Sequence, residues 1–159
     1  MAWPEPVERV SAALRAAAVD ARVEEFSEGT PTARDAAKAA GCELSQIVKT
    51  IVMVVDGSFV LVLVPGDRRA EEGAVAAALG AGQVRAASAA EVVQATGFEP
   101  GGVAPFPQKA VAHALLHRDL LQHEEVWIGA GTDRHMACLR PADLARVARA
   151  RTFDDGARG

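Results

Sequence analysis

The stretch Ser45–Arg69, "SQIVKTIVMVVDGSFVLVLVPGDRR", constrains the fold of this chain more than any other. Two apolar, β-branched runs, Ile51–Val55 and Phe59–Val64, are separated by Asp56-Gly57. An Asp-Gly pair between two such runs is a strong hairpin signal, because both residues tolerate a positive φ. Neither run alternates cleanly between apolar and polar residues. We therefore expect a β-hairpin whose two faces are both covered by other parts of the chain.

One charged residue, Lys49, stands at the entrance to the first of these two strands. An isolated buried charge is costly, so the ammonium group must either stay in water or meet a partner. The simplest interpretation is a lysine that extends from a strand end into solvent.

The remaining segments mix helical and strand patterns without a regular βαβ alternation. Thr32 and Ser88 are expected to be N-caps, and Glu91 would complete a capping box with Ser88. We expect helices within residues 7–19, 33–41, 66–82, 88–97 and 141–150, and further strands within 21–28, 83–88, 110–117, 119–131 and 135–141.

These elements predict the α+β fold class: a single domain with a mixed, mostly antiparallel, strongly curved sheet flanked by helices. A chain of 159 residues is long enough to bury one substantial core. We assign residues 1–150 to this domain. The last residues, 151–159 ("RTFDDGARG"), are expected to form a flexible tail.

Charge and composition argue against several classes of function. The formal net charge is −4, whereas proteins that wrap duplex nucleic acid usually carry a basic face, so we expect no DNA partner. A local contact with one nucleic-acid end remains compatible with this charge. No apolar run approaches the roughly 20 residues that span a bilayer. The N-terminus lacks the apolar segment of a signal peptide, and Cys42 and Cys138 show no CxxC spacing, which predicts a reduced, cytoplasmic chain.

The sequence also offers little support for a metal or a nucleotide cofactor. His113 and His117 are four residues apart, but the HExxH glutamate is missing and the segment has a strand pattern. Strand geometry would separate these two histidines by roughly 13 Å. The segment "GAGTDRH" contains a G-x-G without the rest of a dinucleotide fingerprint, and no GxSxG elbow is present. We expect neither a metal site nor a cofactor.

A loop rich in glycine and proline, "TGFEPGGVAPFPQK" (residues 96–109), is the remaining candidate for chemistry. Proline restricts φ, and glycine permits close backbone approach, so this loop should be rigid and should expose amide groups. Such amides can bind an ester carbonyl or a phosphate without a catalytic side chain. A tight structural crossover is the alternative.

Taken together, "IVKT", "VPGDRR", "ATGFEPGG" followed by "VAP", and the closing "GAG" with "PADL" resemble the YbaK family. These proteins are free-standing relatives of the editing domain inserted in bacterial prolyl-tRNA synthetases. The resemblance extends over roughly Val23 to Val147, with the motifs in the family's order and spacing. The pair of a Lys-Thr before a hairpin and a later TG(F/Y)xxGGxxP is the most specific part.

The resemblance implies hydrolysis of mischarged aminoacyl-tRNA in trans, with a small amino acid such as Cys or Ala on tRNA-Pro as substrate. Ser and Thr would also fit a small pocket. It implies the tRNA acceptor end as partner, and prolyl-tRNA synthetase as a further candidate partner. The implied catalytic residues are Lys49, Gly101 and Gly102, and the implied substrate-binding residues are Phe26, Thr50, Val103, Ala104, Pro105, Gly131 and His135.

The chain departs from the family pattern at several positions. Ala104 stands where serine often precedes the loop proline, and Pro107 stands where glycine is common. Phe26 and Met136 align with positions at which some members have tyrosine and aspartate. These positions shape or polarise the amino-acid pocket, and His135 is a candidate to supply the missing polar group.

In the mechanism that the resemblance implies, loop amides stabilise the developing oxyanion and Lys49 holds the substrate or polarises its ester. Either water or, for a cysteinyl substrate, the thiol of the substrate itself attacks the ester. A small pocket would select by size. Two alternatives remain: a module that binds aminoacyl-tRNA or a synthetase without hydrolysis, and a hydrolase of small esters.

Overall fold

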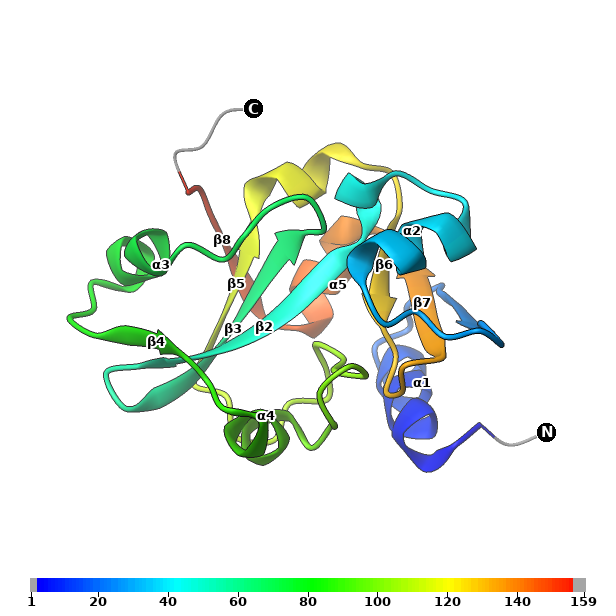
Figure 1. The fold of residues 1–159 in the computed structure, drawn as a ribbon, viewed down its shortest axis with the longest axis horizontal. Helices are drawn as coiled ribbons and strands as arrows, with labels where there is room; N and C mark the ends of the chain where they lie inside the picture. The colour runs from blue at the N-terminus through cyan, green and yellow to red at the C-terminus, as the bar shows by residue number, and fades with distance from the viewer. Residues whose placement is uncertain (1–2, 156–159) are drawn as a thin grey trace.

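The computed structural model describes residues 3–155. Its helices are α1 (Glu5–Ala16), α2 (Ala33–Ala40), α3 (Glu72–Leu79), α4 (Ala89–Thr96) and α5 (Pro141–Val147), with 3-10 turns η1 (Leu44–Gln46) and η2 (Arg118–Gln122). Its strands are β1 (Arg22–Glu25), β2 (Val48–Val55), β3 (Ser58–Pro65), β4 (Val84–Ala86), β5 (His113–His117), β6 (Val126–Gly129), β7 (His135–Leu139) and β8 (Ala150–Phe153). The α+β class expected from the sequence is confirmed (Figure 1).

The strands form two sheets rather than the single curved sheet that we expected. The larger sheet has the order β4-β2-β3-β5-β8, and the smaller one has the order β1-β7-β6. The pairs β3–β5 and β5–β8 are parallel, while β2–β3, β2–β4 and both pairs of the smaller sheet are antiparallel. A single parallel bridge between Ile47 and Trp127 joins the two sheets just before β2 begins.

The hairpin β2–β3 forms around Asp56 and Gly57, which have φ values of 47° and 84°. The Asp56 carboxylate accepts hydrogen bonds from the amides of Gly82 and Gln83, which lower its pKa. Both faces of the hairpin are covered, as the sequence predicted. Val60, Val62 and Val64 pack towards α3, whereas Leu61 and Leu63 pack into the opposite clusters.

The local signals for helix ends are confirmed at two helices. The Thr32 hydroxyl accepts a hydrogen bond from the Asp35 amide at the start of α2. At α4 the Ser88 and Glu91 side chains form the reciprocal capping box. These caps fix where α2 and α4 begin, and α2 forms one wall of the site described below.

The expected tail does not begin at residue 151, because Ala150–Phe153 form strand β8 at the edge of the larger sheet. This strand pairs in parallel with β5, and the Phe153 ring is buried against the edge of the His117 ring. Arg151 and Thr152 stay exposed, so the segment shows no apolar periodicity in the sequence. Its partner β5 is more than thirty residues earlier, and only the fold brings them together. Residues 156–159 of the expected tail lie outside the described residues.

Among residues 3–155, no helix has both the length and the apolar character needed to cross a bilayer.

Candidate functional site

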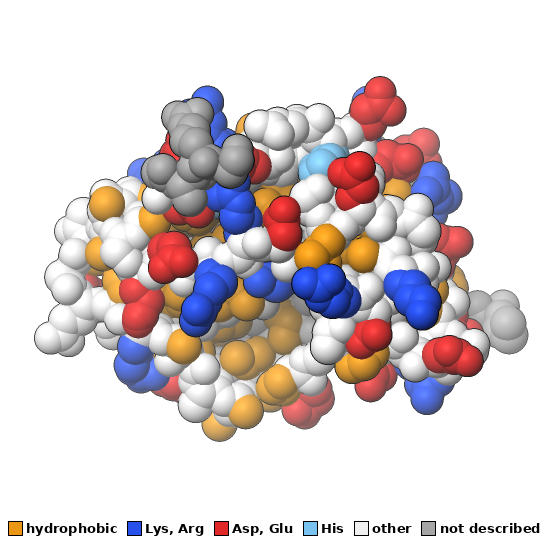
Figure 2. Space-filling model, turned by 45° about the horizontal axis from the view of Figure 1, so that its top comes forward, with side chains coloured by type: hydrophobic (Ala, Val, Ile, Leu, Met, Phe, Trp, Pro, Cys, Tyr) orange, Lys and Arg blue, Asp and Glu red, His pale blue; other side chains and the backbone are white. Residues whose placement is uncertain are grey.

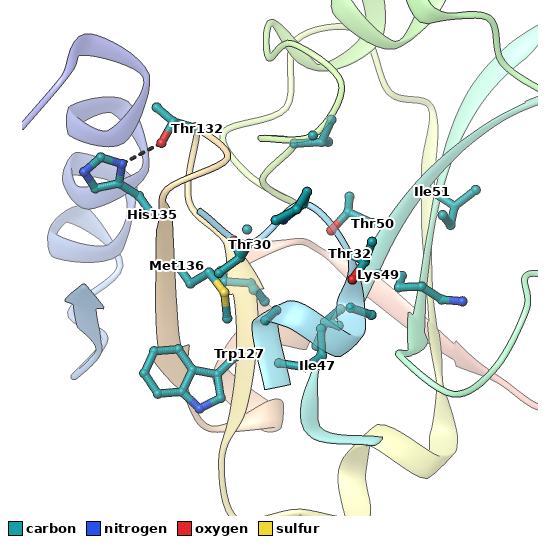
Figure 3. A pocket seen from close by; sticks show the side chains of 18 residues that line it. Thr30, Thr32, Ile47, Lys49, Thr50, Ile51, Trp127, Thr132, His135 and Met136 are labelled. Carbon is teal, nitrogen blue, oxygen red and sulfur yellow. Dashed lines mark hydrogen bonds between the residues drawn. The ribbon is translucent and has the colours of Figure 1, made fainter. Parts of the chain in front are cut away.

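A cavity of about 290 Å³ lies where α2, the first half of β2 and the smaller sheet meet (Figure 3). Its walls come from α2 with the residues before it, from β2, and from strands β6 and β7, which are far apart in sequence. The glycine-rich loop adds a further side. The lining residues are Thr30–Ala33, Ala36, Ile47–Ile51, Gly101, Val103, Trp127–Gly129, Thr132, His135 and Met136.

The first half of β2 reaches this cavity as a sheet edge. Strand β4 pairs with only Met53–Val55, so the earlier residues of β2 have no strand partner on this side within residues 3–155. Successive side chains of a strand point to opposite faces. Figure 3 shows the consequence: the Thr50 hydroxyl points to the side of the cavity where Thr30 and Thr132 lie, whereas the Lys49 ammonium points the other way.

Lys49 lines the cavity and is half-buried, so it is not the fully solvated strand end of the simplest interpretation. Burial lowers the pKa of its ammonium, and the nearby positive charge of Arg69 lowers it further. Asp67, on the same turn as Arg69, acts in the opposite direction and raises the pKa of Lys49. The Lys49 ammonium therefore lies between a cation and an anion, and Arg69 affects its pKa more strongly than Asp67 does.

Among the described residues that line the cavity, Thr50 alone has a buried side-chain polar atom without a hydrogen-bond partner. Its Oγ1 atom is buried and has no hydrogen-bond partner among the described residues. Leaving a buried hydroxyl unpaired typically costs about 1–3 kcal/mol. This hydroxyl can therefore donate to or accept from a ligand at little further desolvation cost.

The opposite wall is apolar and comes from strands β6 and β7. Trp127 and Met136 are buried there and pack with Ile47 and Ala36. Phe26 does not line the cavity. It supports this wall from behind, with its ring edge-to-face to Trp127 at a centroid distance of 6.0 Å.

The glycine-rich loop forms one side of the cavity, but only some of its residues line it. Gly101, with φ 95°, and Val103 line the space. Gly102 instead packs on the loop between β6 and β7, where an added Cβ would lie 2.6 Å from the Thr132 Cα. Its amide donates to the Glu99 carbonyl at 3.0 Å. Ala104 and Pro105 are buried behind the lining, with Ala104 in the main core.

His135 and Gly131 belong to the β6–β7 turn, and neither points a polar group at Lys49 or Thr50. Figure 3 shows the His135 ring directed away from both, and its Nδ1 shares a 2.5 Å hydrogen bond with Thr132 Oγ1. The His135 ring also packs edge-to-face with the Trp3 ring, with the two ring centroids 5.5 Å apart. Gly131, with φ 108°, packs against the Pro6 backbone. These contacts tie the N-terminal segment to the rim of the site.

The structure thus brings five of the ten expected site residues to the cavity surface: Lys49, Thr50, Gly101, Val103 and His135. The other five lie behind or beside it. Sequence reasoning missed the apolar wall of Trp127 and Ile128 and the contribution of Thr30 and Thr132. A tryptophan inside a strand is ordinarily read as core, and no local pattern indicates that this one also borders a cavity. Within residues 3–155, no group of three or more His, Cys, Asp or Glu side chains is placed to hold a metal ion.

This chain is similar in structure and in sequence to proteins connected with prolyl-tRNA synthetase. A crystal structure of a protein proposed to be a trans-editing enzyme for prolyl-tRNA synthetase superposes with a TM-score of 0.88 at 34% identity, over 98% of this chain and 100% of that one. The proline–tRNA ligase of Xanthomonas axonopodis pv. citri is 32% identical over 127 residues, which cover 78% of this chain and 22% of the ligase. The corresponding ligase of Lactobacillus gasseri is 44% identical over 61 residues, which cover 38% of this chain and 11% of that one. The chain therefore corresponds to about a fifth or less of these ligases.

The family model described as the aminoacyl-tRNA editing domain matches residues 27–147. This range contains β2, the glycine-rich loop and the β6–β7 turn, each of which contributes residues to the cavity lining. The chain belongs to the aminoacyl-tRNA editing domain family.

Proposed function

We propose that this protein is an aminoacyl-tRNA deacylase that hydrolyses the ester of mischarged tRNA. The observation that carries the proposal is the cavity itself. It combines an unpaired buried hydroxyl, a half-buried lysine, the glycine-rich loop and an apolar wall within one site of an editing-domain fold. An ester of this kind is already activated, so positioning and charge stabilisation are sufficient for catalysis.

In this proposal the oxyanion binds to loop amides that border the cavity. The amides of Gly101 and Val103 have no hydrogen-bond acceptor among the described residues, and both residues line the cavity. The Gly102 amide already donates to Glu99, so Gly102 serves the close packing of the loop rather than the oxyanion. Water attacks the ester carbon, and for a cysteinyl substrate attack by its own thiol is the alternative.

Selection of the amino acid would depend on size and polarity. Trp127, Met136 and Ile47 offer an apolar wall, which favours a small apolar or thiol side chain over a charged one. The Thr50 hydroxyl is placed to bind a polar group of the aminoacyl moiety. We propose alanine or cysteine on tRNA-Pro as substrates, by analogy with the similarity to proline–tRNA ligases.

The structural neighbour that matches nearly end to end supports action in trans, on tRNA released by a synthetase. We propose the tRNA acceptor end and prolyl-tRNA synthetase as partners, with the cytoplasm as the compartment in which they meet. A non-catalytic module that only binds aminoacyl-tRNA is the competing interpretation.

A deacylation panel separates these two interpretations. Purified protein is incubated with tRNAs charged with alanine, cysteine, serine, threonine or proline, and the loss of ester is followed over time. A deacylase accelerates the loss of at least one small amino acid and spares prolyl-tRNA-Pro. A binding module retains aminoacyl-tRNA on a filter and leaves every ester at its spontaneous rate.

A further inference from the structure

Two consecutive arginines on the turn between β3 and α3 have different surroundings. Arg68 is half-buried and pairs with Asp119 at 2.8 Å and with Asp155 at 3.4 Å. Arg69 is exposed and forms no ion pair with any residue of the range 3–155. The first arginine therefore anchors the turn, while the second presents its guanidinium to solvent.

The turn is held tightly on both sides. At Gly66 an added Cβ would lie 2.5 Å from the Leu44 carbonyl oxygen, so the backbone packs directly on η1. The Arg68 amide donates to the Pro65 carbonyl at 2.9 Å. Together with the two carboxylates on Arg68, these contacts fix the position from which the Arg69 side chain extends.

Lys49 faces this turn. It pairs across the hairpin with Val64, immediately before Pro65, and its side chain leaves β2 on the face opposite Thr50 (Figure 3). The charge of Arg69 is close enough to lower the pKa of Lys49, and the Asp67 carboxylate only partly offsets it. On the face drawn in Figure 2, several Lys and Arg side chains lie in a row next to an apolar hollow, with Asp and Glu side chains around them. Lys49 and Arg69 therefore repel one another, and the nearby Asp67 carboxylate offsets only part of this repulsion. An anion that binds between the two cations would remove the rest.

We propose that Lys49 and Arg69 form a phosphate subsite at the edge of the cavity, and that it binds a backbone phosphate of the tRNA 3′ end. This inference rests on the proposed function. A guanidinium offers a planar fork to phosphate oxygens, and an ammonium acts as a compact point charge beside it. The terminal nucleotide then crosses the free edge of β2, with its phosphate on the Lys49 side and its aminoacyl ester on the Thr50 side.

Binding of the trinucleotide CCA, measured by isothermal titration calorimetry at several salt concentrations, tests the subsite. Arg69→Gln should weaken binding about tenfold, because a charge-assisted phosphate contact is lost. The slope of log K against log salt should fall by about 0.7, the value for one contact with a single strand. Arg69→Lys keeps the charge but not the fork, so it should bind more tightly than Arg69→Gln, more weakly than the parent, and with the salt slope of the parent. Asp67→Asn should tighten binding because it removes the opposing carboxylate.

The matched control is Arg149→Gln, at an exposed arginine just before β8, three strands away from β2 in the sheet. Its affinity and salt slope should equal those of the parent protein. The subsite is refuted if the parent protein does not bind CCA, if Arg69→Gln binds like the parent, or if Arg149→Gln loses as much affinity. Deacylation is scored separately. CCA binding that depends on Arg69, without ester hydrolysis, would refute the proposed function and leave the subsite standing.

Discussion

Lys49 and Thr50 are neighbours in the chain, but the pleat of β2 sends their side chains to opposite sides of the strand. This separation suggests a division of roles, with the charge directed to the phosphate backbone and the hydroxyl to the aminoacyl group. Family resemblance alone would place both residues on the same ester. Successive side chains of a strand point to opposite faces, so the geometry of β2 itself supports separate roles for Lys49 and Thr50.

Thr50→Val tests the role of the hydroxyl at nearly constant side-chain volume. The Thr50 hydroxyl is buried without a partner, so replacing it with a methyl group should leave the free energy of unfolding unchanged or raise it slightly. If the hydroxyl binds substrate, the rate of deacylation should fall about tenfold, which corresponds to the loss of one hydrogen bond. Thermal unfolding and single-turnover rates provide the two measurements. Thr50→Ser keeps the hydroxyl and should retain most of the rate. A Thr50→Val protein with full activity would assign this residue to packing.

At the scale of elements, the glycine-rich loop depends on its close contact with the β6–β7 turn. Gly102→Ala should shift the loop, because the new Cβ would lie 2.6 Å from a backbone atom of Thr132. We expect a loss of deacylation greater than the loss of stability, since Gly101 and Val103 move with the loop. Gly73→Ala is the matched control: it lies in α3, where an added Cβ meets nothing within 4 Å, and should stabilise by roughly 0.5–1 kcal/mol. Equal activity of both variants would show that the position of the loop does not matter.

The capping box of α4 makes a prediction about acid stability. Hydrogen bonds from Arg85 and the Ser88 amide lower the pKa of Glu91 to about 2. A carboxyl whose pKa is lower in the folded state stabilises the fold above its unfolded pKa, and this contribution is lost as pH falls towards 2. Glu91→Gln should therefore melt at a lower temperature at neutral pH, and the difference from the parent should shrink between about pH 4.5 and pH 2. Melting curves across this range check the sign. A difference that does not change with pH would contradict it.

The sequence predicts the elements whose determinants are local. The Asp56-Gly57 turn, the Thr32 cap and the Ser88–Glu91 box each lie within a few residues, and each forms as expected. Strand β8 and the division into two sheets depend on partners distant in the chain, and these were missed. The same reason explains the site. Lys49 and the Gly101–Val103 loop were found through their motifs, whereas Trp127 and Thr132 reach the cavity only through the packing of β6 and β7 against β2.

At the scale of the whole molecule, the C-terminal residues connect the larger sheet to the turn beside the site. Strand β8 completes the sheet edge, and Asp155 lies 3.1 Å from the buried His117 Nε2 while pairing with Arg68. The segment 150–155 is therefore part of the folded domain, and its Asp155 contacts Arg68, the residue that anchors the Arg69 turn.

Truncation separates this interpretation from the tail that we expected. A chain that ends at Arg149 loses the buried Phe153 and every β8 hydrogen bond, so its melting temperature should fall on the order of 10 °C. A chain that ends at Asp155 keeps these contacts and should melt like the parent. Equal melting temperatures of the two shortened chains would show that β8 contributes nothing to stability.

The central claim, that this cavity hydrolyses mischarged tRNA with the help of Lys49, is tested most directly by one comparison of rates. Alanyl-, cysteinyl- and prolyl-tRNA-Pro are incubated with the parent protein, with Lys49→Ala and with Lys38→Ala, an exposed lysine on α2 outside the cavity lining. We predict that the parent and Lys38→Ala hydrolyse at least one of the two mischarged tRNAs far faster than prolyl-tRNA-Pro. Lys49→Ala should be slower by about a hundredfold, because the tRNA end, and with it the ester, is no longer held in position, with little change in melting temperature. Hydrolysis at the spontaneous rate by the parent protein, or full activity of Lys49→Ala, would contradict the account.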